Sequence, residues 1–534
     1  MRAARLTPTS LARQANAHTS KARARVMPAP KRARASGERA VDRVNKFRAG
    51  PNNGVDVASS ASRPPRAGEV VTTETFRVKG LHLSDHYLTA PLAHDADDEH
   101  TIRVFFREVV SAQRGNASAA ERVGLPCVLF LQGGPGFECG RPTEASGWLG
   151  ELTKDHRVFL MDQRGTGKSN AEILRPTRSS EDELERPTLI VAGTDGFDAA
   201  EQWVHLLKCF RADSIVRDAE LFRKTFLGEN TKWTLLGQSF GGFCITTYLS
   251  FHPEGVKEAL LTGGLPPLID ADAPAFEAYL RLMKRVKTQN EKFRKRFPAD
   301  VKRIEYLHEH IRNASTSLPG GGQLTHTHVQ ALGFANLGTA QGMERLHYIL
   351  EHVEPESTFE KPLTHKFLIE VENAFRHFET NPLYAILHES IYCNGANAYG
   401  AADKAYGRGD WAGSADESYP DIGYFTGEMV FDDFFNDIPS LVKYREIRGA
   451  LLLHEHWPKL YDTNALSKNT VPVACASYVE DMFVDFDLAA ETAAKINGAR
   501  VWATSEYMHS GIREDGERIV RKLLSFVRDE DPIR

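Results

Sequence analysis

The alternation of strand-like and helical segments constrains the fold of this chain more than any other feature. Strand-like runs occur at Thr101–Val110, Pro126–Gln132, Arg157–Met161, Trp233–Gly237, Ala259–Thr262, Val471–Ala476 and Arg500–Ala503. Those from Pro126 onward are short and almost continuously apolar, as strands buried on both faces of a parallel sheet are. Helical patterns such as Ala200–Cys209 and Asp213–Phe226 lie between them. The alternation predicts an α/β fold with a doubly wound, mostly parallel sheet.

A long helical segment interrupts this alternation. Between about Ile269 and Lys468 the strand pattern is replaced by helical patterns at Ala275–Arg296, Val301–Asn313, Gln341–Glu351 and Pro382–Cys393. Asn381 is expected to cap the last of these helices, and Gly395 to close it. We therefore expect a core in two parts, residues 67–268 and 469–534, separated by a helical cap domain over residues 269–468. Residues 394–425 are expected to form a long loop at the cap surface.

The first 66 residues differ in charge from the rest of the chain. They contain 15 Lys and Arg against Glu38, Asp42 and Asp56, a balance of 15 − 3 = +12, so the remainder carries −5 − 12 = −17. A basic, serine-containing segment poor in acids is typical of a plastid or mitochondrial transit peptide, and equally of a disordered basic tail. Six cysteines without a C-x-x-C pair favour reduced thiols. We expect an intracellular protein, cytoplasmic or organellar.

Several classes of partner are disfavoured. A body this acidic is a poor match for nucleic acid, whose phosphates dominate binding, and no stretch approaches 18 consecutive apolar residues, so no membrane span is expected. His308-Glu309-His310 and His454-Glu455-His456 lack the i, i+4 histidine spacing of a zinc-binding helix, so no metal site is expected. The pattern gives no indication of the oligomeric state.

The central chemical motif is Gly237-Gln238-Ser239-Phe240-Gly241. It stands between the strand-like Trp233–Leu236 and the helical Phe243–Phe251. A serine on such a strand-to-helix turn projects its hydroxyl from the edge of the sheet, and the neighbouring glycines avoid clashes in the sharp turn. Ser239 is therefore the predicted nucleophile, and the backbone N–H of Phe240 is a predicted oxyanion-hole donor.

Two further strand ends carry glycine-rich turns. Gly133-Gly134-Pro135-Gly136 follows the strand-like Cys127–Leu131, where the second oxyanion donor of an α/β-hydrolase fold arises, and we assign this donor to Gly134. Within Met161–Ser169, the Gly165–Ser169 portion resembles a phosphate loop, but Asp162 stands where that motif requires glycine, so a nucleotide site is rejected. We interpret the segment as a charged turn that braces the active-site loops.

The general base and its orienting acid should follow the serine in the order Ser, Asp or Glu, His. Asp481 follows the strand-like Val471–Tyr478, and His509 follows the last strand. Both positions lie at the carboxyl edge of the sheet, where open α/β sheets bind ligands. Asp481 and His509 are the predicted acid and base. Glu480, Asp485 and Asp487 are the alternatives for the acid.

Together these motifs resemble the proline iminopeptidase (prolyl aminopeptidase) family. The resemblance rests on G-G-P-G at 133–136, D-Q-R-G-x-G-x-S at 162–169, G-Q-S-F-G-G at 237–242, Y-V-E-D-M at 478–482 and H-S-G at 509–511. It implies a serine exopeptidase on the α/β-hydrolase fold that releases an N-terminal residue, preferably proline, through an acyl-enzyme and without a cofactor. Its substrates would be short peptides with a free N-terminus.

The resemblance also suggests how the free amine is bound. A glutamate in an E-x-x-Y context on a cap helix binds it in the family, and Glu389-Ser390-Ile391-Tyr392 is similar to that context. Glu480 is a second candidate. Gln132 and Phe240 depart from the family's common histidine and tryptophan at these positions, but neither change removes a backbone donor.

Two other functions remain open from the sequence. One is an esterase or another peptidase on the same fold. The other, of a different class, is a catalytically inactive hydrolase fold that acts as a binding protein, which the intact Ser, Asp and His disfavour.

Overall fold

The structure is a computed structural model. It describes residues 66–96, 99–114, 124–170, 174, 178–180, 183–269, 274–354, 363–398, 400–408 and 424–530. The predicted basic extension therefore lies outside the described residues, except for Arg66. No helix in the described ranges is long and apolar enough to cross a bilayer.

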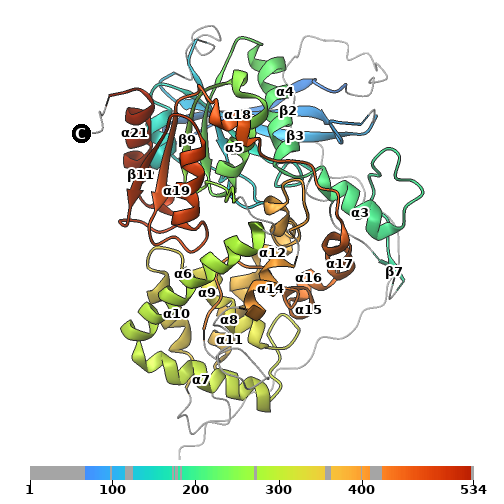
Figure 1. Ribbon diagram of the computed structural model, residues 1–534, viewed down its shortest axis with the longest axis vertical. Helices are drawn as coiled ribbons and strands as arrows, with labels where there is room; N and C mark the ends of the chain where they lie inside the picture. Colours follow the sequence, from blue (N-terminus) through green and yellow to red (C-terminus); the bar gives the residue numbers. More distant parts are fainter. Residues whose placement is uncertain are drawn as a thin grey trace, which may run out of the picture. The chain divides into compact units, whose positions relative to one another are not determined.

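One large sheet organises the protein (Figure 1). Its strands, within the described residues, are β1 (Val70–Val78), β2 (Leu81–Pro91), β3 (Thr101–Ser111), β4 (Cys127–Leu131), β5 (Arg157–Asp162), β8 (Trp233–Gln238), β9 (Val256–Thr262), β10 (Val473–Tyr478) and β11 (Ala499–Thr504). Their order is β1-β2-β3-β5-β4-β8-β9-β10-β11. The six strands from β5 to β11 are parallel, and β1, β2 and β3 pair antiparallel. The predicted mostly parallel sheet is confirmed.

Helices cover both faces of this sheet, as a doubly wound fold requires. The core helices are α2 (Gly147–Leu152), α3 (Ala199–Lys208), α4 (Ala212–Phe222), η2 (Arg223–Leu227), α5 (Phe240–Phe251), η3 (Pro253–Gly255), α18 (Thr463–Ser467), α19 (Phe486–Lys495), α20 (Gly511–Glu514) and α21 (Gly516–Val527). Apolar side chains of α4, α5 and α19 join one core, and those of α2 and α21 join a second core on the opposite face. A short ribbon, β6 (Arg178–Ser180) with β7 (Glu183–Leu184), lies apart from the main sheet.

A set of helices fills the chain between β9 and β10. They are α6 (Pro274–Arg296), α7 (Pro298–Asn313), α8 (His326–Gln330), α9 (Leu332–Asn336), α10 (Gly342–Leu350), α11 (His365–Phe375), α12 (His377–Thr380), α13 (Leu383–Ile386), η4 (Glu389–Tyr392), α14 (Ala401–Arg408), α15 (Phe434–Asp437), α16 (Pro439–Val442) and α17 (Arg445–Leu453). In Figure 1 most of them gather on one side of the sheet. We propose that they form the expected cap domain.

The structure corrects three local predictions in this region. The predicted helix Pro382–Cys393 is two short pieces, α13 and η4, and the Asn381 side chain donates to Gly136 O (3.1 Å) and Glu138 Oε2 (2.8 Å) instead of capping a helix. The loop predicted over residues 394–425 contains α14, while its residues 409–423 lie outside the described part. Finally, α18 packs beside α5, and Asp462 N donates to Ser250 Oγ (3.1 Å). The chain thus returns to the core before residue 468.

Candidate active site

Ser239 lies on a strained turn between β8 and α5. Its φ is 55° and its ψ −126°, a conformation that side chains other than glycine rarely adopt. The turn ends at Phe240, the first residue of α5. Its N–H is one of the first four N–H groups of the helix, which have no carbonyl partner within the helix. Strain, serine and free N–H groups at one place are what the strand–turn–helix motif predicts.

The glycines of this turn are required by close backbone contacts. A Cβ at Gly237 would lie 2.5 Å from Gly241 O, and one at Gly241 would lie 1.9 Å from Leu131 O. A Cβ at Gly242 would lie 2.2 Å from Gly264 O. These glycines therefore let α5 start directly against the ends of β4 and β9.

The glycine-rich loop after β4 passes beside the serine. A Cβ at Gly133 would lie 3.1 Å from Ser239 Cβ and 2.6 Å from Gln238 Oε1. Gly134 has φ 140°, a value that favours glycine. The loop thus passes beside Ser239, and Gly134 lines the same pocket as the serine. The roles of the Gly134 and Phe240 N–H groups as oxyanion-hole donors stay predictions.

Asp481 and His509 are paired at the ends of β10 and β11. His509 Nδ1 lies 2.8 Å from Asp481 Oδ2, and the two side chains are buried. Asp481 Oδ1 accepts from the N–H groups of Phe483 (2.8 Å) and Val484 (3.1 Å), which fixes the carboxylate. The Phe483 ring stacks on the imidazole with centroids 4.6 Å apart. These contacts fix the plane of the imidazole and favour the tautomer with the proton on Nδ1.

The electrostatic surroundings of His509 favour its protonated form. Burial lowers the pKa of His509, but the charge and hydrogen bond of Asp481, together with the charge of Glu428, outweigh that effect and raise the pKa overall. An imidazole stabilised in this way is suited to hold a proton taken from the serine hydroxyl.

A pocket of about 330 Å³ joins these groups. Its lining consists of Gln132, Gly133, Gly134, Phe137, Glu138, Gln238, Ser239, Tyr384, Glu428, Phe483, His509 and Arg513. The predicted nucleophile, the predicted base and one predicted oxyanion-hole residue thus face one space, while Asp481 lies directly behind His509.

Sequence reasoning missed two carboxylates in this pocket, Glu138 and Glu428. Tyr384 Oη donates to Glu428 Oε1 at 2.6 Å, and burial raises the pKa of Glu428 to about 7. Within the described residues no basic side chain forms an ion pair with it. Glu428 belongs to an irregular segment before α15, where neither periodicity nor a recognised motif could have pointed to it.

Glu389 lies elsewhere, contrary to its predicted place in the substrate site. It is fully buried, accepts from the N–H groups of Gly400 (2.7 Å) and Ala402 (2.9 Å), and pairs with Arg448 at 3.3 Å. It is not among the residues that line the pocket. The expected helix is broken at this point, and Glu389 is turned toward the Arg448 side chain of α17.

The remaining acidic candidates are also bound to other groups. Glu480 accepts from Gln289 Nε2 (2.9 Å) and pairs with Lys292, outside the pocket lining. Asp485 caps α19 and pairs with Arg285 (2.9 Å), which also pairs with Asp487 (2.7 Å). Among the acids considered from the sequence, Asp481 therefore holds the position beside His509.

The turn after β5 braces the glycine-rich loop. Asp162 accepts from Cys139 N (3.1 Å) and Arg141 Nη1 (2.9 Å), and Gln163 Nε2 donates to Gln132 O at 2.9 Å. Arg164 is fully buried against Asp218. A side chain at Gly167 would meet Asp162. These contacts brace the glycine-rich loop after β4.

One group of side chains in the described part of the chain has the spacing of metal ligands: Glu220, His252 and Glu254. Glu220 is already engaged by Arg223 (2.8 Å) and by the Tyr248 hydroxyl (2.5 Å). None of the three lines the pocket that contains Ser239.

The family model for the alpha/beta hydrolase fold matches residues 126–306. This range contains the strands β4, β5, β8 and β9 and the turn that carries Ser239. Among solved structures, the chain is similar to the enol-lactonase from Burkholderia xenovorans LB400, with 12% identity, 80% of this chain and 97% of that chain covered, and a TM-score of 0.35.

Two curated relatives cover most of the chain. The proline iminopeptidase of Aeromonas sobria is 39% identical over 458 residues, 85% of this chain and 98% of the relative. The proline iminopeptidase aneH of Aspergillus aculeatus is 31% identical over 451 residues, 84% of this chain and 94% of the relative. With this identity over nearly the whole of both relatives, the chain belongs to the proline iminopeptidase family of α/β hydrolases.

Proposed function

We propose that this protein is a serine aminopeptidase that releases an N-terminal residue, preferably proline, from short peptides. The observation that carries the proposal is a single pocket in which Ser239, His509 and the carboxylate of Glu428 meet. Of these three residues, hydrolysis of an ester or amide as such requires only Ser239 and His509. A carboxylate without a basic partner among the described residues supplies what an aminopeptidase needs in addition, a partner for the substrate's ammonium group.

The reaction follows from the positions of the three catalytic side chains. Ser239 Oγ attacks the carbonyl carbon of the first residue, and His509 Nε2 takes the hydroxyl proton, while Asp481 holds Nδ1–H and stabilises the imidazolium. The backbone N–H groups of Gly134 and Phe240 stabilise the oxyanion. His509 then gives the proton to the departing amine. Water, activated by the same imidazole, hydrolyses the acyl-enzyme and restores Ser239.

We assign the amine site to Glu428 instead of Glu389 or Glu480. The ammonium of the substrate and the carboxylate of Glu428 would each lose water in the pocket, and their pairing offsets that cost. The Tyr384 hydroxyl, 2.6 Å from Oε1, leaves Oε2 available to the ligand. Glu138, the other acid in the lining, accepts from Asn381 Nδ2 (2.8 Å) and is held against the cap.

The aromatic lining supports a preference for proline. Phe137 and Tyr384 lie with ring centroids 4.7 Å apart, and Phe483, which stacks on His509, also lines the pocket. Flat aromatic faces pack well against a compact, apolar pyrrolidine ring. These aromatic faces offer no charged group to pair with a long charged side chain at the N-terminal residue of a substrate.

A substrate panel tests the proposal. Prolyl arylamide, N-acetyl-prolyl arylamide, alanyl arylamide and a short acetyl ester are compared on the full chain, with Ser239→Ala as the control for contaminating activity. We expect cleavage of free prolyl arylamide well above the alanyl compound and little cleavage of the acetylated one. An enzyme that cleaves the ester but neither free arylamide is an esterase, and the proposal is then wrong.

A separate experiment tests the cellular compartment. The basic first 66 residues support an organellar address, which we propose as the alternative to the cytoplasm. A fluorescent protein fused behind residues 1–66 would report import, and uniform cytoplasmic fluorescence would contradict it.

A further inference from the structure

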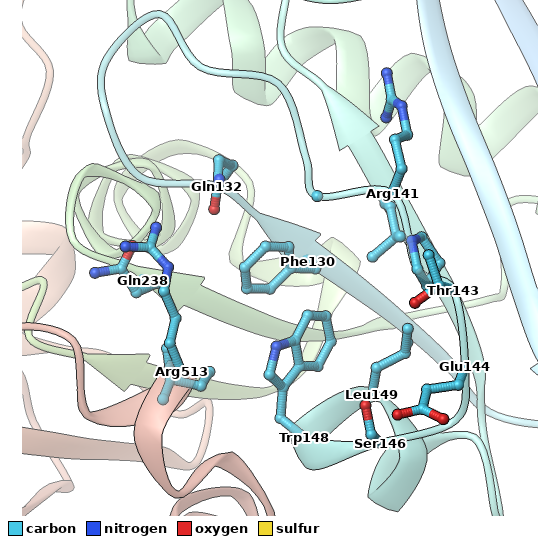
Figure 2. A pocket seen from close by; sticks show the side chains of 14 residues that line it. Phe130, Gln132, Arg141, Thr143, Glu144, Ser146, Trp148, Leu149, Gln238 and Arg513 are labelled. Atoms are coloured by element: carbon cyan, nitrogen blue, oxygen red, sulfur yellow. The ribbon is translucent and has the colours of Figure 1, made fainter. Parts of the chain in front are cut away.

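A second cavity adjoins the catalytic pocket. It measures about 340 Å³, within the range of roughly 300–1,000 Å³ that small-ligand sites occupy. Gln132, Gln238 and Arg513 line both spaces. Figure 2 shows these three side chains at one end of the cavity. The two spaces are therefore neighbours that share part of their lining.

The cavity has an apolar floor and a polar far end. The Phe130 and Trp148 rings stack with centroids 4.4 Å apart and an interplanar angle of 27°. In Figure 2, Glu144 and Ser146 lie at the end opposite Arg513. Glu144 pairs with Lys79 at 2.9 Å, so its charge is balanced. A ligand in the cavity would thus contact aromatic surface along its length.

Of the two arginines that line this cavity, Arg141 and Arg513, only Arg513 has no acidic partner among the described residues. Its side chain forms no hydrogen bond or ion pair with any described residue, and it is exposed to the cavity. Arg141, the other arginine of the lining, donates to both oxygens of Asp162. An arginine presents a planar fork of donors that fits a carboxylate in a bidentate way. Arg513 is therefore available to bind an anion from solution.

The catalytic geometry indicates which part of a substrate reaches Arg513. His509 gives its proton to the departing amine, so the leaving peptide starts beside the imidazole. Arg513 follows His509 by four residues, lines the same pocket and acts on the imidazole electrostatically. Glu428, proposed to hold the N-terminal ammonium, forms no ion pair with Arg513 within the described residues. The two opposite charges thus remain free for the two ends of one short peptide.

We propose that this second cavity is the leaving-group subsite and that Arg513 binds the C-terminal carboxylate of a di- or tripeptide substrate. The proposal rests on the proposed aminopeptidase function. Arg513 would be a specificity-determining residue that favours short peptides with a free carboxylate, and the Phe130–Trp148 floor would favour an apolar or aromatic residue after the scissile bond.

The test compares peptides that differ only in their C-terminal charge. Pro-Ala and Pro-Ala-Ala, each as the free acid and the amide, are assayed with the full chain. At one or both lengths we expect kcat/KM for the acid to exceed that for the amide by roughly 10- to 100-fold, mainly through KM, the range for hydrogen bonds to charged groups. Arg513→Gln should bring the ratio close to one, and Arg513→Lys should retain part of it.

Arg518→Gln is the matched control. Arg518 is exposed, lies outside both linings and pairs with Glu506, so its replacement should leave the acid-to-amide ratio as in the wild type. Equal rates for acid and amide at both lengths in the wild type, or an unchanged preference in Arg513→Gln, would overturn the subsite. Failure of the proposed function looks different: no prolyl substrate, including the arylamide, is then cleaved.

Discussion

Ser239 combines an unfavourable backbone conformation with a position that chemistry needs. A residue with φ 55° and ψ −126° persists only where its surroundings impose that conformation, here the glycine contacts around the turn. Ser239→Ala keeps the Cβ and the backbone, so we expect an unchanged circular dichroism spectrum and melting temperature. Turnover of prolyl arylamide should fall by roughly 10³–10⁶-fold in kcat. A folded variant that retains a tenth of the activity would exclude Ser239 as the nucleophile.

Glu428 and Glu389 are predicted to respond differently to the same substitution. In Glu428→Gln the Tyr384 hydroxyl keeps an acceptor, but the substrate ammonium loses its charge partner. Removal of one member of a buried ion pair costs about 3–5 kcal/mol, so kcat/KM for prolyl arylamide should fall by roughly 150- to 5,000-fold. Hydrolysis of a short neutral ester at pH 8 should change little, since an ester has no ammonium group.

Glu389→Gln is the comparison. It leaves the buried guanidinium of Arg448 with less compensating charge, so the melting temperature should fall, whereas the ratio of arylamide to ester activity should stay as in the wild type. If Glu389→Gln abolishes arylamide cleavage selectively and Glu428→Gln does not, the amine site is at Glu389 after all.

The charge of Glu428 also sets the pH dependence of the base. His509 accepts the serine proton only when neutral, so activity is lost as the pH falls through its pKa. The negative charge of Glu428 raises the pKa of His509, and its removal in Glu428→Gln must lower that pKa. We expect the acid limb of kcat for a neutral ester, measured from pH 5 to 9, to move to lower pH. Glu480→Gln, remote from the pocket, should leave the limb in place. An upward shift in Glu428→Gln would contradict the assignment.

At the scale of elements, the start of α5 depends on backbone contacts that no side chain can enter. A Cβ at Gly241 would lie 1.9 Å from Leu131 O, so Gly241→Ala must push α5 away from β4. We expect a loss of at least about 2 kcal/mol in the free energy of unfolding, measured by urea denaturation. Gly449→Ala is the opposite case: it lies inside α17 with nothing within 4 Å of an added Cβ, and should stabilise by roughly 0.5–1 kcal/mol. Equal stability of both variants would show that the turn can relax.

The elements themselves were largely predictable where one physical signal dominates. The buried strands β4, β5 and β8 are continuous apolar runs, and the Gly-x-Ser-x-Gly turn between β8 and α5 is fixed by glycine sterics. β1 and β2 were missed because β1 is mostly exposed and β2 mixes polar with apolar residues, so neither gives a buried-strand pattern. Both are held instead by antiparallel pairing with neighbours distant in sequence.

The cap was predictable only in outline. Long amphipathic helices such as α6 and α7 repeat every 3.6 residues and were found, but the short pieces α13 and η4 were read as one helix. Their break is caused by tertiary contacts: Asn381 binds the glycine-rich loop and Glu389 binds Arg448. Glu428 reaches the pocket through the same packing, from an irregular segment. Such contacts join residues far apart in sequence, and local patterns do not encode them.

At the scale of the whole molecule, buried histidines in the chain between β9 and β10 should link stability to pH. Burial lowers the pKa of His308, His328, His377 and His388 to about 4. Two carboxyls with large shifts act in the opposite sense, because burial raises the pKa of Asp403 to about 6 and that of Glu428 to about 7. The other shifts in this stretch oppose one another: burial lowers the pKa of His326 and His454 and raises that of Glu389 and Asp433. The balance between these two groups decides the sign of the effect.

Between about pH 4.5 and 6.5 unfolding lets the four histidines take up protons and the two carboxyls release them, a net uptake of up to 4 − 2 = 2 protons. The unfolded state then binds more protons than the folded state, so stability rises with pH and is lost as the pH falls from about 6.5 toward 4.5, by roughly 1–3 kcal/mol for each pH unit. Urea denaturation at pH 5, 6 and 7 measures this slope. His328→Gln removes one buried titrating group and should flatten it, whereas His365→Gln, at an exposed position on α11, should not. A slope of zero, or stability that increases on acidification, would contradict this prediction, because the carboxyls would then offset or outweigh the histidines.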